Sequence, residues 1–406
     1  MTGTVTKSMS GVVGGKRRYE VLIVLAVTLA LIFIVPLLLS GFRLGLLGRI
    51  LSLAIVALGI DLIWGYTGLL SLGHGIFFAL GGYALAMHLQ LQGESIPDFF
   101  SLYGVSELPG FWKPFYSFPF TLVGIVLIPS IIAGLLGYLV FRNRIRGVYF
   151  SILTQAALVV FFNFFNGQQK LINGTNGLKT NTTELFGQAV GGDRMQFYFY
   201  CITVVMLALA YGICRWLTSG RFGRMLIAIR DDENRVRFSG YDPTAFKVVV
   251  FAVSGGIAGV AGALYTVQSG IVSPQYMSIA FSIEMVIWVA VGGRASLIGA
   301  IIGALAVRWG QTLLSEEYPT IWLFFQGALF LIVVTVLPNG IVGWARYEAM
   351  DQPRSLFGSG PKKLSTYPRI EVDEDLRQEA ELLADKPSGA SSSDPVTGPA
   401  PGGENS

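Results

Sequence analysis

The feature that most constrains this chain is a succession of apolar stretches, each about as long as a bilayer is thick. A helix needs about 20 apolar residues to cross the hydrocarbon core, because it rises only about 1.5 Å per residue. Of the 406 residues, 52% are hydrophobic and 13% are charged, whereas soluble domains carry about 25% charged residues. The sequence therefore predicts an all-α protein that crosses a membrane many times.

We predict about ten transmembrane helices. The stretches are approximately residues 20–40, 46–64, 69–90, 118–141, 148–165, 196–217, 248–269, 281–293, 296–313 and 321–340. The first is too long for the apolar core of a signal peptide and has no cleavage motif, so we expect it to be retained. Residues 281–293 are too short to cross alone, so this segment is expected either to be part of a broken helix or to re-enter the membrane.

The charged loops orient these helices. Lys and Arg concentrate in cytoplasmic loops, and here they gather before the first span, at 142–146, in the loop 218–247 and after the last span. The acidic loop 91–117 then falls outside. Ten spans with both termini in the cytoplasm satisfy every strongly charged loop.

Three regions differ in composition. Residues 1–18 are predicted to be a cytoplasmic N-terminal extension, and residues 19–345 the transmembrane domain with its polar loop 218–247. Residues 346–406 form a cytoplasmic tail whose end consists mainly of Pro, Gly and Ser. Such a composition cannot bury enough apolar surface to order itself, so we expect the tail to be largely disordered.

The loop 218–247 is the longest polar interruption between two spans, and a short helix is expected inside it. Asp231 can cap the free amide groups of its first turn, and the acidic residues Asp232 and Glu233 suit the positive end of its dipole. Gly240 can end it in a left-handed turn. The helix is either a docking surface on which a cytosolic partner pushes or a solvated segment whose arginines only set topology.

Glycines and uncharged polar residues at membrane depth indicate a candidate translocation path. Unwound backbone is tolerated there only where protein buries it or where it lines a water-filled cavity. Amide and hydroxyl groups suit a small neutral solute, although each of them could equally serve helix packing or an interhelical hydrogen bond. The candidate residues are Gly65, Tyr66, Thr67, Gly68, Ser71, His74, Thr154, Gln155 and Gln268, together with Glu284, an ionisable residue at membrane depth.

Several motifs are absent from the sequence. It contains no P-loop, so we expect this chain to hydrolyse no nucleotide, and no nucleophile or zinc-protease motif, so we predict no catalytic residue. Two histidines and two cysteines without metal-ligand spacing predict no metal site, and we expect no cofactor and no nucleic acid partner.

Longer stretches of the chain resemble a known family. They are residues 65–84, 146–156, 173–178, 220–247, 251–274 and 282–305. In order and spacing they are similar to the permeases of branched-chain amino acid and urea ABC importers, over about residues 45–345. The segments 235–243, 268–274, 282–288 and 338–343 resemble the urea subgroup most.

This resemblance implies a permease subunit of a urea ABC importer in the bacterial cytoplasmic (inner) membrane. The implied partners are a second, related permease subunit, two cytosolic ABC ATPase subunits that hydrolyse the ATP, a periplasmic binding protein and membrane lipid. The loop helix would contact the ATPase through Arg230, Asp231, Asp232, Glu233, Arg235, Arg237 and Gly240. A permease for branched-chain amino acids or short amides, or a stand-alone channel for a small neutral solute, remains an alternative.

Overall fold

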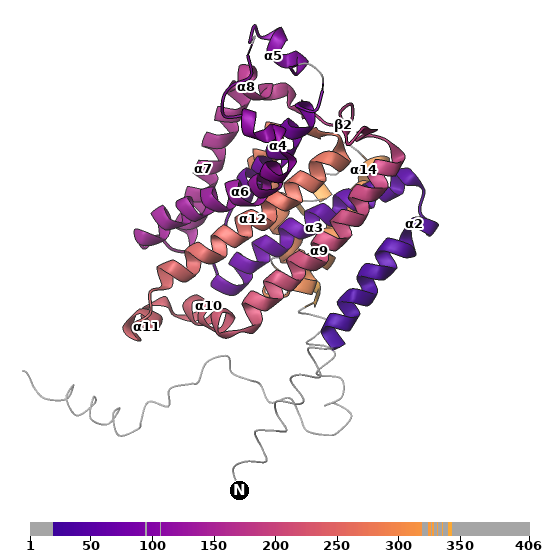
Figure 1. Cartoon of the computed structure of the whole chain (residues 1–406). Helices are drawn as coiled ribbons and strands as arrows, with labels where there is room; N and C mark the ends of the chain where they lie inside the picture. Colours follow the sequence, from indigo (N-terminus) through magenta and orange to yellow (C-terminus); the bar gives the residue numbers. More distant parts are fainter. Residues whose placement is uncertain are drawn as a thin grey trace, which may run out of the picture. The chain divides into compact units, whose positions relative to one another are not determined.

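The computed structural model describes residues 19–93, 96–105 and 107–318, together with residues 324, 325, 327, 328, 331, 335 and 340–342. Within these residues, seven helices are long and apolar enough to cross a membrane (Figure 1). They are Tyr19–Leu38, which ends in α2 (Val35–Leu38), α3 (Gly41–Thr67), α6 (Phe118–Arg142), α7 (Val148–Gly167), α9 (Asp193–Ser219), α12 (Pro243–Ser269) and α14 (Leu297–Glu317). The predicted span 321–340 and both termini lie outside the continuously described residues, so the tenth span and the orientation stay predictions.

Two further helices are shorter. They are α4 (His74–Gln90) and α13 (Ile279–Gly292). The predicted span 69–90 is wrong at its start, because residues 68–73 leave helical geometry and the helix begins only at His74. Gly68 has a φ of 74°, a left-handed conformation that costs glycine no steric strain.

The remaining elements are small. On the loops lie α5 (Asp98–Leu102), η1 (Lys113–Tyr116), α8 (Gln169–Ile172), η2 (Gly174–Asn176), α10 (Arg221–Asp231), α11 (Glu233–Phe238) and η3 (Pro274–Met277). Two antiparallel strand pairs join β1 (Leu178–Lys179) to β4 (Ile271–Val272) and β2 (Glu184–Leu185) to β3 (Gln188–Ala189). The prediction of an all-α chain omitted these two-residue strands, which are too short to leave an alternating pattern.

Helices α3 and α12 form the centre of the bundle. Their apolar windows are 83% and 72% buried, whereas that of the first helix, Tyr19–Leu38, is 0% buried. Close packing depends on glycine: a Cβ on Gly262 of α12 would lie 1.7 Å from the Phe78 carbonyl oxygen of α4. Small residues allow such approach, which is the ordinary way for membrane helices to pack.

The chain after α12 returns along α4 toward the C-terminal end of α3. A Cβ on Gly82 would meet Val272, one on Gly75 would meet the Tyr276 carbonyl oxygen, and the Ala295 amide reaches Asp61 of α3. Because β4 and η3 cover the first part of this route, α13 needs only 14 residues for the rest. The sequence leaves open whether residues 281–293 cross the membrane. In the structure most of them form the short helix α13, which follows the non-α-helical segment of β4 and η3.

Candidate functional site

The loop 218–247 lies at the end of the bundle opposite α5 and α8 (Figure 1). It folds into two helices, α10 and α11, with Asp232 between them in an extended conformation. The sequence predicts one helix capped by Asp231, and this is wrong by one residue. The Asp232 carboxylate accepts hydrogen bonds from the amides of Asn234 and Arg235 at 3.0 and 3.2 Å, while Asp231 ends α10.

Gly240 ends α11 as predicted, with a φ of 85°. Its amide donates to the Arg237 carbonyl at 3.0 Å, and the Tyr241 amide donates to the Val236 carbonyl at 3.3 Å. This pair of bonds is the Schellman arrangement, which uses the last free carbonyl groups of a helix. Both ends of α11 are therefore fixed by local hydrogen bonds.

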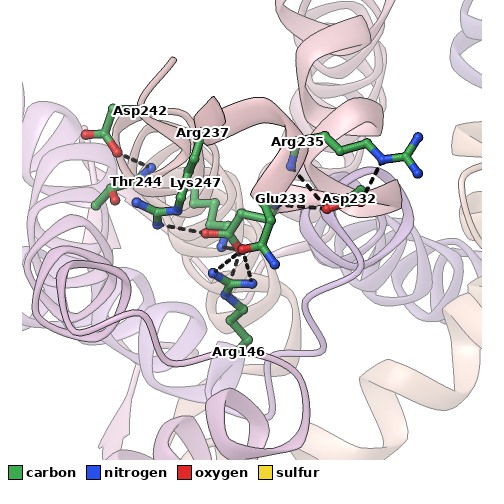
Figure 2. A network of polar contacts seen from close by, with 9 residues as sticks. Arg146, Asp232, Glu233, Arg235, Arg237, Asp242, Thr244 and Lys247 are labelled. Carbon is green, nitrogen blue, oxygen red and sulfur yellow. Dashed lines mark hydrogen bonds and ion pairs between the residues drawn. The ribbon is translucent and has the colours of Figure 1, made fainter. Parts of the chain in front are cut away.

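Glu233 joins α11 to the membrane helices (Figure 2). Its Oε2 lies 2.5 Å from Lys247 Nζ of α12 and 3.2 Å from Arg146 Nε of the loop between α6 and α7. Its Oε1 lies 2.9 Å from Arg237 Nη2. We call these four residues the Glu233 network. The sequence treats Glu233 as a dipole-stabilising residue on a partner-facing helix, but its side chain is only 8% exposed and points inward.

Burial acts to raise the pKa of Glu233, but the hydrogen bonds from Lys247 and Arg237 outweigh it and hold this pKa below its usual range. Lys247 Nζ also lies 5.5 Å from the centre of the Phe141 ring, within cation–π range. On the other side of α11, the side chains of Arg235 and Phe238 are exposed. The network therefore anchors α11 and leaves Arg235 and Phe238 facing outward.

Arg230, at the end of α10, also points toward the bundle. Its Nη1 donates to the Gly65 carbonyl at 3.0 Å, and a Cβ on Gly68 would lie 3.0 Å from its Cγ. Two residues that the sequence assigns to different sites, the loop and the path, are thus in direct contact.

Side chains of α7 hold the non-helical segment 68–73, which we call the α3–α4 break. Thr154 Oγ1 accepts from the Leu72 amide at 3.1 Å, and Ser151 Oγ donates to the Leu70 carbonyl at 2.7 Å. Ser71, also buried, accepts from the Gly73 amide. Sequence reasoning missed Ser151, although a hydroxyl one turn before Thr154 was the available signal.

His74 lies in the packed core, with 1% of its surface exposed. Its Nε2 is 2.6 Å from Ser254 Oγ, and that hydroxyl donates to the Gly59 carbonyl at 2.6 Å. Because the serine has one hydrogen and Gly59 receives it, His74 carries its own hydrogen on Nε2 and donates. His74 therefore links α4 to α12 through Ser254.

The other path candidates do not gather at one point. Thr67 Oγ1 bonds its own helix at the Ile63 carbonyl, Tyr66 OH donates to the Ala295 carbonyl at 3.5 Å, and Gln155 is half-buried. Glu284 of α13 pairs with Arg308 of α14 at 2.8 Å.

Gln268 donates to Thr203 and lines a cavity of ≈ 350 Å³ at the end of α12. It packs against Gly48, which is about 25 Å from Gly65 along α3 at ~1.5 Å per residue. Gln268 is therefore far from the α3–α4 break. Among the described residues, no group of three or more His, Cys, Asp or Glu side chains could hold a metal ion.

The chain is similar in sequence to known membrane permeases. The family model described as "Branched-chain amino acid transport system / permease component" matches residues 42–334. The branched-chain amino acid permease protein LivM of Salmonella typhimurium is 27% identical over 76% of this chain and 70% of its own length. LivH of the same organism is 25% identical over 73% of this chain and 92% of its own length. BraD of Pseudomonas aeruginosa is 21% identical over the same two shares. No solved structure matches.

Proposed function

The chain belongs to the branched-chain amino acid transport permease family, and from this premise we propose that it is the permease subunit of an ATP-driven importer for urea. Its relatives are permease subunits, and its apolar helices make it a multi-pass protein of the inner membrane. ATP hydrolysis then belongs to separate subunits, since the sequence contains no P-loop.

One observation carries the choice of urea: the side chains that hydrogen-bond residues 70–73 of the α3–α4 break are uncharged hydroxyl groups. These hydroxyl groups belong to Ser71, Ser151 and Thr154. Urea needs only hydrogen bonds, whereas an amino acid would bring a carboxylate and an ammonium group whose transfer into this setting costs several kcal/mol without charged partners. The segments 235–243 and 282–288, which resemble urea permeases, agree with this choice.

Branched-chain amino acids are the second candidate, and the names of the relatives favour them. Short amides fit the same neutral groups as urea. A stand-alone channel would also fit these groups, but it has no need of a cytosolic loop helix held to two other segments by the Glu233 network.

The proposed partners are a related permease, two cytosolic ATPases, a periplasmic binding protein and lipid. Both LivM and LivH of one organism match this chain, which supports a pair of related, non-identical permeases. In the proposed mechanism the binding protein delivers the solute, and closure of the ATPases pushes on α10 and α11. We propose Asp232 and Arg235 as ATPase-facing residues because both side chains are more than 40% exposed.

The test is uptake of labelled urea and labelled leucine in cells that lack this subunit and in cells restored with the parent or a variant. We expect the deletion to abolish urea uptake alone. Arg235→Glu, which reverses a charge on the proposed ATPase-facing surface, should not restore it. Arg194→Glu, the same change on an exposed residue at the other end of α9, should restore it fully.

If the deletion abolishes leucine uptake instead, the proposed substrate changes from urea to amino acids, and the proposal of an importer stands. Uptake of both solutes unchanged by the deletion would exclude the importer for either of them. Rapid urea flux through the purified chain alone in vesicles would identify the channel instead.

A further inference from the structure

The contact between α10 and the end of α3 supports a further proposal, which rests on the proposed transport function. We propose that Arg230 is a positioning residue that transmits displacement of α10 to the α3–α4 break, and that it stays attached to α3 throughout the transport cycle. The loop and the break would then move together.

The first argument is the hydrogen bond. Arg230 Nη1 donates to the Gly65 carbonyl at 3.0 Å. The last intrahelical bond of α3 runs from the Gly68 amide to the Trp64 carbonyl, so the Gly65 carbonyl lies among the final groups that a helix leaves without an internal partner. A guanidinium group there satisfies the carbonyl and complements the negative end of the helix dipole. Arg230 is therefore bound to the end of α3 itself.

The second argument is the packing of the Arg230 stem. Gly68 is the first residue of the break, and a Cβ at this position would lie 3.0 Å from Arg230 Cγ. A Cβ here would displace the arginine stem, and the left-handed conformation would strain most other residues. The side chain thus contacts both the last turn of α3 and the first residue of the break.

The third argument is what the same end of α3 holds on its other side. Asp61 Oδ1 accepts from the Ala295 amide at 2.7 Å, and Tyr66 OH donates to the Ala295 carbonyl at 3.5 Å. Ala295 belongs to the turn between α13 and α14. A movement that enters at Arg230 therefore reaches the break directly and the turn through α3.

The contact is also specific to Arg230. Its side chain pairs with Asp231 of its own helix, but its hydrogen bond to Gly65 spans 165 positions of the sequence. Arg224 lies six residues earlier on α10 and is exposed. It provides a matched control, since replacing it removes the same charge from the same helix.

The first experiment compares Arg230→Ala with Arg224→Ala in the complete complex reconstituted in proteoliposomes. Losing one charge-assisted hydrogen bond corresponds to about a tenfold effect or more. We expect Arg230→Ala to hydrolyse ATP at nearly the parental rate while solute uptake per ATP falls by about this factor. Arg224→Ala should keep both rates. Unchanged uptake per ATP in Arg230→Ala would overturn the proposal, and so would a fall in ATP hydrolysis proportional to uptake.

The second experiment replaces the hydrogen bond by a covalent one. A Cβ on Gly68 would lie 4.0 Å from Arg230 Cβ, within the separation of a disulfide. A cysteine at position 68 is strained in both redox states, so the two states of the double variant Gly68→Cys/Arg230→Cys are compared with each other. Uptake per ATP should be low when the protein is reduced and should rise when it is oxidised. Each single variant, oxidised in parallel, should be unaffected by the oxidant. A cross-linked protein with no more uptake than its reduced form would show that the contact has to separate, which contradicts the proposal.

Hydrogen exchange separates failure of this inference from failure of the proposed function. In the parental complex, ATP should change the exchange of the amides in residues 68–73, whereas in Arg230→Ala it should not. This result does not depend on which solute is carried. A parent that imports neither urea nor leucine refutes the proposed function, while equal responses of the two proteins to ATP refute the role of Arg230.

Discussion

Two regions of this protein hold irregular backbone in place by opposite means. Around α11, one carboxylate binds three cations, two of them from other segments of the chain. At residues 70–73 of the α3–α4 break and the adjoining start of α4, the partners are hydroxyls, a histidine and backbone groups. The difference follows access to water. Arg146 of the Glu233 network is 40% exposed, whereas Ser254 and His74 are at most 1% exposed.

The comparison shows where charge is useful in such a protein. At the edge of the bundle a network of charges binds strongly and still reaches solvent, but in the core an unpaired charge costs several kcal/mol. The loop can therefore be anchored by ions, while the break is held by weaker, neutral bonds. We expect the first region to be mechanically firm and the second to change conformation at low cost.

The largest expected effect is that of Glu233→Ala. It leaves Lys247, 4% exposed, without its carboxylate, and breaking a buried ion pair from one side costs about 3–5 kcal/mol. Thermal unfolding of the purified protein in detergent should show a much lower Tm. Asp231→Ala, at an exposed neighbouring carboxylate, is the control and should change stability by less than about 0.5 kcal/mol. Equal Tm values for the two variants would contradict the anchoring role.

Ser254→Ala tests the neutral region. The change removes the acceptor for His74 Nε2 and the donor to the Gly59 carbonyl, and unsatisfied buried groups cost about 1–3 kcal/mol. The Tm of Ser254→Ala should therefore fall clearly, but by less than that of Glu233→Ala. Ser219→Ala, at an exposed position at the end of α9, should leave Tm unchanged. If Ser254→Ala lowered the Tm as much as Glu233→Ala does, the two regions would not differ in the strength of their bonds.

Asp232→Ala removes the N-cap of α11. Replacing a capping Asp by Ala typically costs about 1 kcal/mol, so we expect a modest fall in Tm. Asp231→Ala again provides the comparison, because the sequence favours Asp231 as the cap and the structure favours Asp232. The variant with the lower Tm identifies the cap.

Acidification should have the smallest effect on Tm. The pKa of Glu233 is lower in the folded protein than its ordinary value of 4.5, so its contribution to stability is complete above pH 4.5 and is lost as the pH falls through the folded-state pKa. Glu233→Gln lacks this titration. We expect the Tm difference between parent and variant to be constant above pH 4.5 and to narrow below it. A difference that widens on acidification would contradict the lowered pKa.

Much of the fold could be predicted from apolar stretches, because each of them reports only on its own residues. The spans near α3, α6, α7, α9, α12 and α14 are confirmed with ends shifted by a few residues. The predicted start of α4 is wrong. Residues 69–73 are apolar enough for a helix, and only their hydrogen bonds with Ser151 and Thr154 show why they are not helical. Hydrophobicity marks what lies in the membrane, not how its backbone is bonded.

The sequence by itself determined the class of the protein, its membrane location, the existence of a polar loop helix and the glycine that ends it. These properties depend on composition and on residues a few positions apart. Only the tertiary structure decided that Glu233 points inward, that Asp232 rather than Asp231 is the cap, and that Arg230 holds Gly65. The Arg230–Gly65 contact joins residues 165 positions apart, and which distant segments meet depends on the packing of α3, α9 and α12 around one another. No local pattern records that packing.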